Sequence, residues 1–331
     1  MSNNLHSSLL SLQLVHVPLY VEIYRELYSF PHLLHFTKIL VMNLCYKRIV
    51  NIRKLNNISK LKFYNFSVKN NENYFSNNIL THNCYTYRFG RKYVYINDNI
   101  DEILDRVLVH SKSLFPKVPN QTDDKYWTYD IGVDTDVSLH WKDYDWVKVF
   151  KFFTDTPNIK ATFATKYVNN QLLKYGSEKI RIRFSLMPQN ISDVVETNTA
   201  KILTRIQAID RFTAAGFDAH INFSPVIYYP NWLEDYRRLF ELVDSTVVNK
   251  DLVKSEVIFL THNEYLHNVN LQNGYSKAEE LLWTPYTQEK KVSEYGGDNL
   301  RYQWQFKNEL INDFKQLHKE VIPWNTIRYI F

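Results

Sequence analysis

Three adjacent residues, His82, Asn83 and Cys84, carry side chains that can together cut and rejoin a peptide chain. The carboxamide of an asparagine can attack its own backbone carbonyl, which forms a succinimide and breaks the chain. A neighbouring histidine can give a proton to the leaving amine, and a following cysteine thiolate can act as the nucleophile in acyl transfer. Three such residues also occur in ordinary turns, so only the flanking sequence can distinguish a splicing site from a turn.

A second set of polar residues lies where short apolar segments end. The apolar segments of strand length are residues 126–133, 160–165, 180–186, 220–228 and 256–262. The segments with helical periodicity are residues 99–115, 198–216 and 231–247. Alternation of strands and helices predicts a parallel sheet with helices outside it, open or closed into a barrel. Asn99 or Asp98 can cap the first helix, and Gly216 can end another.

In such folds the chemistry takes place at the carboxyl ends of the strands. The residues at those positions are Asp134, Thr135, Asp136, Lys166, Ser185, Ser224 and Pro225. Two interpretations of them are open. Lys166 is either a site residue or a surface lysine, and Asp134 and Asp136 either face the site or cap the next helix.

Composition limits the class of protein. The 331 residues leave room for one large domain or two smaller ones, and 45% of them are hydrophobic, which suffices for a sizeable core. The two cysteines, Cys45 and Cys84, give no disulfide framework, so we expect a reduced, cytoplasmic protein. His16, Pro18 and Glu22 interrupt the apolar run near the start, and we expect no transmembrane or secretion segment.

The distribution of charge and the local sequence pattern divide the chain into regions. Residues 1–83 contain nine Lys or Arg and three Glu, whereas residues 84–331 contain 31 basic and 32 acidic residues, so the larger part shows no excess of positive charge for binding phosphate. Residues 1–45 match no motif. Residues 46–83 are short alternating runs typical of β-strands, separated by asparagine-rich turns. Residues 84–331 carry the strand and helix pattern.

The segment KFYNFSVKNNENYFSNNILTHN, residues 62–83, together with the cysteine after it, resembles the C-terminal splicing segment of inteins. The resemblance covers about residues 46–84. It implies that Asn83 cyclises, that His82 assists and that Cys84 accepts the upstream chain. Asn65 and Glu72 stand where the intein family commonly has aspartate and histidine, which help to activate the last steps.

Splicing also needs an amino-terminal intein half. We expect it to be supplied by a second polypeptide in trans or encoded upstream of Met1. On this interpretation residues 1–45, otherwise unassigned, are a possible remnant of an intein linker.

The segment CYTYRFGRKYVYINDNIDEILDRV, which begins at Cys84, resembles spore photoproduct lyase and its radical S-adenosylmethionine relatives, a DNA-repair family. The resemblance implies a partial (β/α) barrel of radical S-adenosylmethionine type over residues 84–331, preceded by a small all-β intein segment. It also implies a [4Fe–4S] cluster held by a Cys-x3-Cys-x2-Cys-Tyr loop, in which Cys84 is the third thiolate and Tyr85 follows it. Asn77 and Thr81 stand at the other two cysteine positions, so those cysteines belong to the missing upstream part.

Further segments extend this resemblance to the C-terminus and imply site residues. IKATFATKYVNNQLL places Lys166 at the cofactor carboxylate, and IRIRFSLMP places Ser185 near the cofactor. Asp136 is assigned to cofactor binding as a strand-end carboxylate. LRYQWQF places Arg301 and Tyr302 near the substrate, although both residues are also suited to packing a C-terminal helix.

The implied activity is reductive cleavage of S-adenosylmethionine to a 5′-deoxyadenosyl radical, which abstracts hydrogen, with a nucleic-acid base as the expected substrate. Val133 stands where spore photoproduct lyase has its hydrogen-donating cysteine, so a different donor, such as a tyrosine, or a different substrate is expected. The alternative is a non-catalytic remnant or binding module without a complete cluster loop. His140, His220 and His262 lack the spacing of a metal site and are expected to be structural or solvated.

Overall fold

The computed structural model describes residues 75–76, 79–80, 99–113, 122–132, 136–292 and 298–330. The predicted site residues His82, Asn83, Cys84 and Tyr85 lie outside these ranges, as do Val133 and Asp134. Strands β1 (Phe75–Ser76) and β2 (Ile79–Leu80) form an antiparallel pair in a compact unit separate from the elements that follow. The segment ENYFSNNILT, predicted as one of three β-like runs in residues 46–83, therefore contains two short strands, and the other two runs lie outside the described residues.

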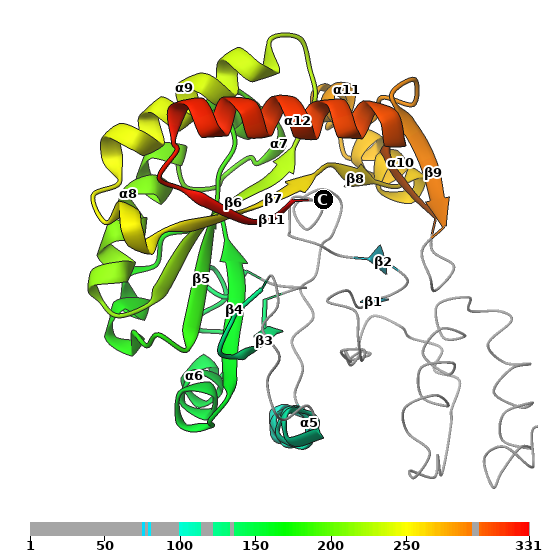
Figure 1. Cartoon of the computed structure of the whole chain (residues 1–331). Helices are drawn as coiled ribbons and strands as arrows, with labels where there is room; N and C mark the ends of the chain where they lie inside the picture. Colours follow the sequence, from blue (N-terminus) through cyan, green and yellow to red (C-terminus); the bar gives the residue numbers. More distant parts are fainter. Residues whose placement is uncertain are drawn as a thin grey trace, which may run out of the picture. The chain divides into compact units, whose positions relative to one another are not determined.

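Six parallel strands form the main sheet. They are β3 (Trp127–Asp130), β4 (Ile159–Thr165), β5 (Ile180–Ser185), β6 (Asp218–Val226), β7 (Lys254–Phe259) and β11 (Thr326–Ile330). Their order across the sheet is β11-β7-β6-β5-β4-β3, with every neighbouring pair parallel. The sheet curls into a half-barrel (Figure 1), which confirms the α/β partial barrel that the sequence predicts.

The strand β5 shows why the sheet has two different faces. Its residues alternate between apolar (Ile180, Ile182, Phe184) and polar (Arg181, Arg183, Ser185), and all six are buried. The apolar set packs on the helices, as in the contact between Phe184 and Phe212, whose rings lie 5.3 Å apart. Because side chains alternate between the faces of a strand, the polar set must point into the barrel.

Helices cover the outer face of the half-barrel (Figure 1). They are α5 (Ile100–Ser113), α6 (Trp146–Asp155), α7 (Gln189–Val195), α8 (Ile202–Ala214), α9 (Trp232–Thr246) and α12 (Trp304–Val321), with short turns η2 (Asn170–Tyr175) and η3 (Lys250–Leu252). Gly216 ends α8 as predicted, since its φ of +95° is the left-handed conformation that glycine adopts freely. None of the described helices combines the length and apolarity needed to cross a bilayer.

An inserted subdomain, residues 261–302, separates β7 from α12. It consists of β8 (Thr261–His262), α10 (Glu264–Gln272), α11 (Ser276–Leu282), β9 (Gln288–Val292) and β10 (Asp298–Tyr302). The three strands form an antiparallel sheet in the order β8-β10-β9. The sequence pattern predicts one strand over residues 256–262, and the structure divides it between β7 of the barrel and β8 of the subdomain.

Helix α12 returns the chain to the barrel and lies along α9. Its Phe314 is fully buried, and the ring lies 5.3 Å from that of Phe240 on α9 and 5.6 Å from that of Phe223 on β6. One side chain thus joins two helices and the sheet.

Replacing Phe314 with alanine is expected to lower the free energy of unfolding by about 3–5 kcal/mol, because the truncation leaves a cavity among aromatic rings. Urea unfolding followed by circular dichroism measures the change. Gln316→Ala, an exposed position two residues further along the same helix, is the control and should change the value by less than about 0.5 kcal/mol. Equal effects of the two substitutions would contradict the packing described here.

Candidate active site at the strand ends

A buried lysine is the centre of the first group at the carboxyl edge of the sheet. Lys166 directly follows β4, and its Nζ lies 3.1 Å from Oε1 of Glu196, which follows α7. The other oxygen, Oε2, accepts a hydrogen bond of 2.8 Å from Nη1 of Arg205 on α8. The side chains of Glu196 and Arg205 are 0% exposed, and that of Lys166 is 5% exposed. Lys166 is therefore an interior cation rather than a surface lysine.

Two cations surround one carboxylate in this group. Burial alone would raise the pKa of Glu196, but the charges of Lys166 and Arg205 bring the pKa below its ordinary value. Arg205 also donates from Nη1 to the carbonyl of Ser185 at 2.8 Å, which fixes the end of β5. These three side chains alone carry one more positive than negative charge, and the buried carboxyl of Asp136 also interacts electrostatically with Lys166.

Asp136 links the end of β4 to the turn that follows Asp136 in the chain. Its Oδ2 accepts a hydrogen bond of 2.9 Å from the backbone N–H of Lys166, and its Oδ1 accepts one of 2.7 Å from Oγ1 of Thr165. Oδ1 also accepts from the N–H groups of Ser138 and Leu139 at 3.0 and 3.2 Å. Burial raises the pKa of Asp136, against the effect of these hydrogen bonds. Asp136 thus caps the following turn and braces β4, and a direct role toward a cofactor stays a prediction.

Ser185 and Asn222 form a neutral polar pair beside this group. They are partners in the register of β5 and β6, and Nδ2 of Asn222 lies 3.5 Å from Oγ of Ser185. Oδ1 of Asn222 is buried and has no hydrogen-bond partner among the residues that the structure describes. A ligand that donates a hydrogen bond at this position would satisfy it.

Tyr302 of the inserted subdomain reaches the end of β6, whereas Arg301 pairs within the subdomain. The hydroxyl of Tyr302 accepts a hydrogen bond of 2.7 Å from the N–H of Tyr228, just beyond the end of β6. Tyr302 is 1% exposed, and burial raises its pKa. Arg301 pairs with Glu289 across the β9–β10 ladder at 2.8 Å. The structure thus uses Tyr302 as an anchor, and contact of either residue with a substrate stays a prediction.

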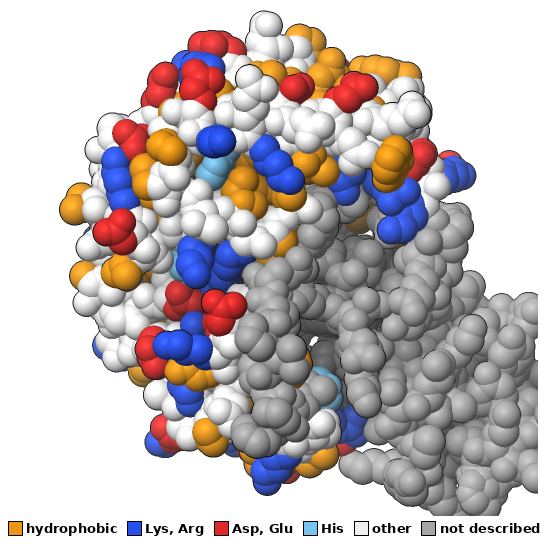
Figure 2. Space-filling model, in the orientation of Figure 1, with side chains coloured by type: hydrophobic (Ala, Val, Ile, Leu, Met, Phe, Trp, Pro, Cys, Tyr) orange, Lys and Arg blue, Asp and Glu red, His pale blue; other side chains and the backbone are white. Residues whose placement is uncertain are grey.

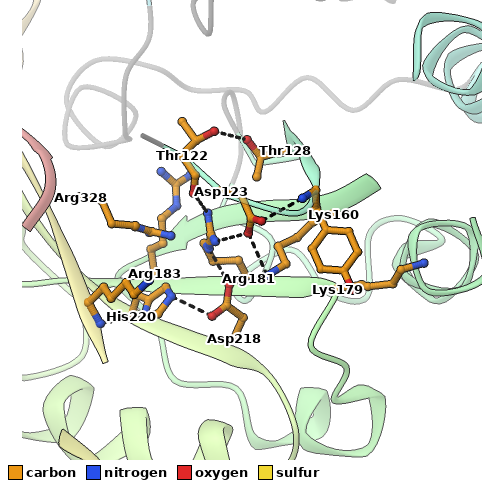
Figure 3. Close-up of polar contacts among 12 residues, drawn as sticks. Thr122, Asp123, Thr128, Lys160, Lys179, Arg181, Arg183, Asp218, His220 and Arg328 are labelled. Atoms are coloured by element: carbon orange, nitrogen blue, oxygen red, sulfur yellow. Dashed lines mark hydrogen bonds and ion pairs between the residues drawn. The ribbon is translucent and has the colours of Figure 1, made fainter. Parts of the chain in front are cut away.

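Charged side chains occupy the barrel interior at the amino ends of the strands (Figure 3). Arg181 on β5 donates from Nε to Asp218 of β6 and from Nη2 to Asp123, both at 2.7 Å. Lys160 on β4 lies 2.8 Å from Asp218 and 3.2 Å from Asp123. Two cations therefore share two carboxylates, which lets all four charges stay buried or nearly so.

A second layer of ion pairs lies one step along the strands. Arg183 contacts Asp130 on β3 and Glu256 on β7, and Glu256 also accepts from Arg328 on β11. Burial alone would raise the pKa of Glu256, but the two arginines lower it to about 2. These two layers take up the polar positions at the amino end, so polar positions able to face a ligand remain at the carboxyl end.

A family model described as spore photoproduct lyase matches residues 75–331 of the chain. The chain therefore belongs to the spore photoproduct lyase family. The match begins nine residues before Cys84, inside the segment that resembles an intein, and the boundary at Asn83 stays a prediction.

Individual relatives agree with the family assignment. The curated spore photoproduct lyase of Bacillus subtilis (strain 168) is 25% identical over 171 residues, which are 50% of this chain and 48% of that protein. The chain thus spans about half the length of the curated relative.

Solved structures in the family share the fold. A cysteine-to-alanine mutant of spore photoproduct lyase is 18% identical, with a TM-score of 0.65 over 76% of this chain and 73% of that one. A double mutant with bound AdoMet and dinucleoside spore photoproduct has a TM-score of 0.64 at 18% identity, with the same coverage. Spore photoproduct lyase complexed with dinucleoside spore photoproduct has a TM-score of 0.65 at 19% identity, over 75% of this chain and 72% of that one.

Among the described positions inferred from the spore photoproduct lyase family, Lys166 and the backbone of Ser185 are linked through Glu196 and Arg205. Glu196, Arg205 and Asn222 were not among the residues predicted from the sequence. Glu196 and Arg205 come from the helical layer and not from strand ends, and no spacing in the sequence marks them. Asn222 could have been found, because it occupies an inward position of β6 two residues before the predicted Ser224.

His220 provides a test of the interior charges in this family member. Its Nε2 lies 2.8 Å from Oδ1 of Asp218, while its Nδ1 accepts a hydrogen bond of 3.0 Å from the N–H of Lys254. A neutral imidazole, which donates from one ring nitrogen and accepts at the other, satisfies both contacts. Burial lowers the pKa of His220 from 6.5 to about 4. The unfolded chain therefore binds a proton between pH 6.5 and 4 that the folded chain does not, and stability rises with pH through this window.

We expect His220→Gln to remove about 2–3 kcal/mol of this pH dependence. The stabilising contribution of the neutral His220 is present above pH 6.5 and is lost as the pH falls toward 4. The difference in the free energy of unfolding between parent and variant should therefore become smaller in acid. Urea unfolding at several pH values between 4 and 7 measures it. A difference that stays constant with pH would show that His220 keeps the same protonation in both states.

Proposed function

We propose that residues 84–331 form the carboxyl-terminal part of a radical S-adenosylmethionine enzyme that abstracts hydrogen from a nucleic-acid base. The observation that carries this proposal is the family match over residues 75–331. A half-barrel whose free polar positions lie at the carboxyl edge supports it. Because the chain spans about half of its curated relative, we propose that the activity needs a further segment, to which this chain adds the half-barrel.

The strand-end residues fit S-adenosylmethionine. Its carboxylate suits the excess positive charge of the group of Lys166, Glu196 and Arg205. Its ammonium group can donate to Oδ1 of Asn222, which has no hydrogen-bond partner within the described part of the chain, or to Oγ of Ser185. Asp136 would hold Lys166 in place through the backbone. Bound beside a reduced [4Fe–4S] cluster, S-adenosylmethionine supplies the 5′-deoxyadenosyl radical.

The cluster does not fit this chain alone. Three thiolates are needed to leave one iron open for the cofactor, and the sequence contains two cysteines, of which only Cys84 lies in the segment that resembles the cluster loop. We therefore propose that protein splicing completes the loop, with His82 and Asn83 releasing Cys84 and a separate segment bringing two more cysteines. An amino-terminal intein and extein half is the partner that this requires.

The substrate proposal rests on the inserted subdomain. Lys290 and Lys291 of β9 are exposed, and basic side chains gather over the β9–β10 end of the surface in Figure 2. Tyr286 and Trp304, 77% and 64% exposed, flank this hairpin and can stack on unpaired bases. The dinucleoside bound by the related structures is of the same chemical class. Since Val133 stands at the position of the donor cysteine, the final hydrogen donor is proposed to be a different residue, such as a tyrosine.

Splicing can be read from the intact mass of the protein in its natural host. We expect residues 1–83 to be absent, with a foreign peptide joined at Cys84. Asn83→Ala should leave the whole chain, and His82→Ala should slow cleavage by about 10²–10⁴-fold, the range of general acid catalysis. If the unaltered chain is also found whole, the chain is the non-catalytic remnant that the cysteine count alone would suggest.

Nucleic-acid binding is tested separately on the full chain. Lys290→Ala with Lys291→Ala should weaken binding of a labelled single-stranded oligonucleotide and reduce the slope of log K against log salt by about 0.7 for each lost phosphate contact. Fluorescence anisotropy between 50 and 200 mM salt measures both. Lys315→Ala with Lys319→Ala, two exposed lysines of α12, is the matched control. If the control pair lowers affinity as much, the hairpin is not the binding surface.

A further inference from the structure

Three side chains from three elements of the inserted subdomain converge on one point. His262 belongs to β8, His267 to α10 and Glu279 to α11, and one ligand atom from each lies within 4.8 Å of the others. Nε2 of His262 is 3.0 Å and Nδ1 of His267 is 2.6 Å from the same oxygen, Oε2 of Glu279. Two imidazoles and a carboxylate are a ligand set that Zn²⁺ takes in proteins.

The charge of Glu279 needs a counter-ion. The other buried glutamates, Glu196 and Glu256, each pair with lysine or arginine side chains. The ion pairs of Glu279 within the described residues are with His262 and His267 alone. Its side chain is 2% exposed and that of His262 is 0% exposed. A divalent cation would compensate this charge inside the protein.

The surrounding residues already hold the three ligands in orientation. The side-chain amide of Asn270, which is 0% exposed, donates to Oε1 of Glu279 and leaves Oε2 facing the imidazoles. The ring of Trp283 stacks on His267 at 4.1 Å with an interplanar angle of 12°. Fixed partners of this kind are what metal ligands have in well-formed sites.

We propose that His262, His267 and Glu279 bind a divalent transition metal, Zn²⁺ in the first place. Bonds of about 2.0–2.1 Å in a tetrahedron separate the ligand atoms by roughly 3.3 Å, so the nitrogen–oxygen distances of 2.6 and 3.0 Å must open by only part of an ångström. The metal replaces the protons that now join the imidazoles to the carboxylate. The fourth position is left to water.

Burial and connectivity indicate a structural role. His267, 17% exposed, is the ligand nearest to solvent. β8 pairs with β10, with His262 opposite Leu300 and Thr261 opposite Arg301. A metal at this point would tie α10 and α11 to the strand pair that carries Arg301 and Tyr302. The spacing His262-x4-His267-x11-Glu279 follows none of the usual zinc patterns, which is why the sequence does not reveal it.

The test uses the full chain, stripped of metal with a chelator and then titrated with Zn²⁺ against a chromophoric competitor. We expect one ion per chain and a melting temperature raised by several degrees at saturation. Co²⁺ in place of Zn²⁺ should give visible tetrahedral bands without the near-ultraviolet band of a cobalt–thiolate bond. The double variant Cys45→Ser with Cys84→Ser should bind the metal unchanged.

Ligand variants decide the location. Since loss of an outer-shell partner alone weakens binding by about 10–100-fold, Glu279→Gln and His267→Ala should each weaken Zn²⁺ binding by more than about 100-fold. His140→Ala is the matched control, because His140 pairs with the single carboxylate of Asp143 at 2.7 Å, and it should bind Zn²⁺ normally. Circular dichroism checks that each variant is folded. Absence of one-to-one binding, a thiolate band with Co²⁺, or binding that survives in folded His267→Ala would each overturn the proposal.

Discussion

Arg183 reaches from the central strand β5 to carboxylates on two other strands, Asp130 on β3 and Glu256 on β7. The charged side chains on the inner face of the sheet are buried, so a charge that points into the barrel must find an opposite charge there. One guanidinium thereby connects strands that share no backbone ladder. Removing either carboxylate would leave a buried cation with incomplete compensation, and the curl of the sheet is what keeps these partners within reach.

The ion pairs also decide where a ligand can bind. Along β5 the inward positions are Arg181, Arg183 and Ser185, and the neighbouring β6 has Asp218, His220 and Asn222 at the positions in register with them. Both strands therefore change from charged to neutral side chains toward the carboxyl end. The charged layers satisfy one another, whereas Oδ1 of Asn222 has no hydrogen-bond partner among the described residues. A polar ligand that supplies hydrogen bonds can be accommodated at the neutral, carboxyl end of these strands. At the amino end the same ligand would have to break ion pairs.

Local pattern was enough to predict five of the six strands of the main sheet and the helices α5, α8 and α9, but not the contacts among them. Buried strands are recognisable because both faces are covered, and Gly216 marks the end of α8 because few other residues adopt its backbone conformation. The pattern IRIRFS predicts a strand, but nothing in it says that the arginines, rather than the isoleucines, face the barrel interior. The contact of Lys166 with Glu196 joins residues 30 positions apart, and that of His262 with Glu279 joins residues 17 positions apart, with both carboxylates at or within helices, so local spacing cannot predict them. Asp136 shows a further limit, since a strand-end carboxylate and a turn cap look the same in sequence.

The inserted subdomain is held to the barrel at points that bear on any role in substrate binding. The hydroxyl of Tyr302 binds the backbone at Tyr228 beyond β6, and its ring packs 6.5 Å from that of Phe259 at the end of β7. Helix α12, which begins two residues later, then lies along α9 through Phe314. The strand pair β8–β10 is therefore fixed at one end by the barrel and at the other by the cluster of His262, His267 and Glu279. A hairpin fixed in this way presents Lys290 and Lys291 from a defined position relative to the strand ends, as the proposed binding of a nucleic-acid base would require.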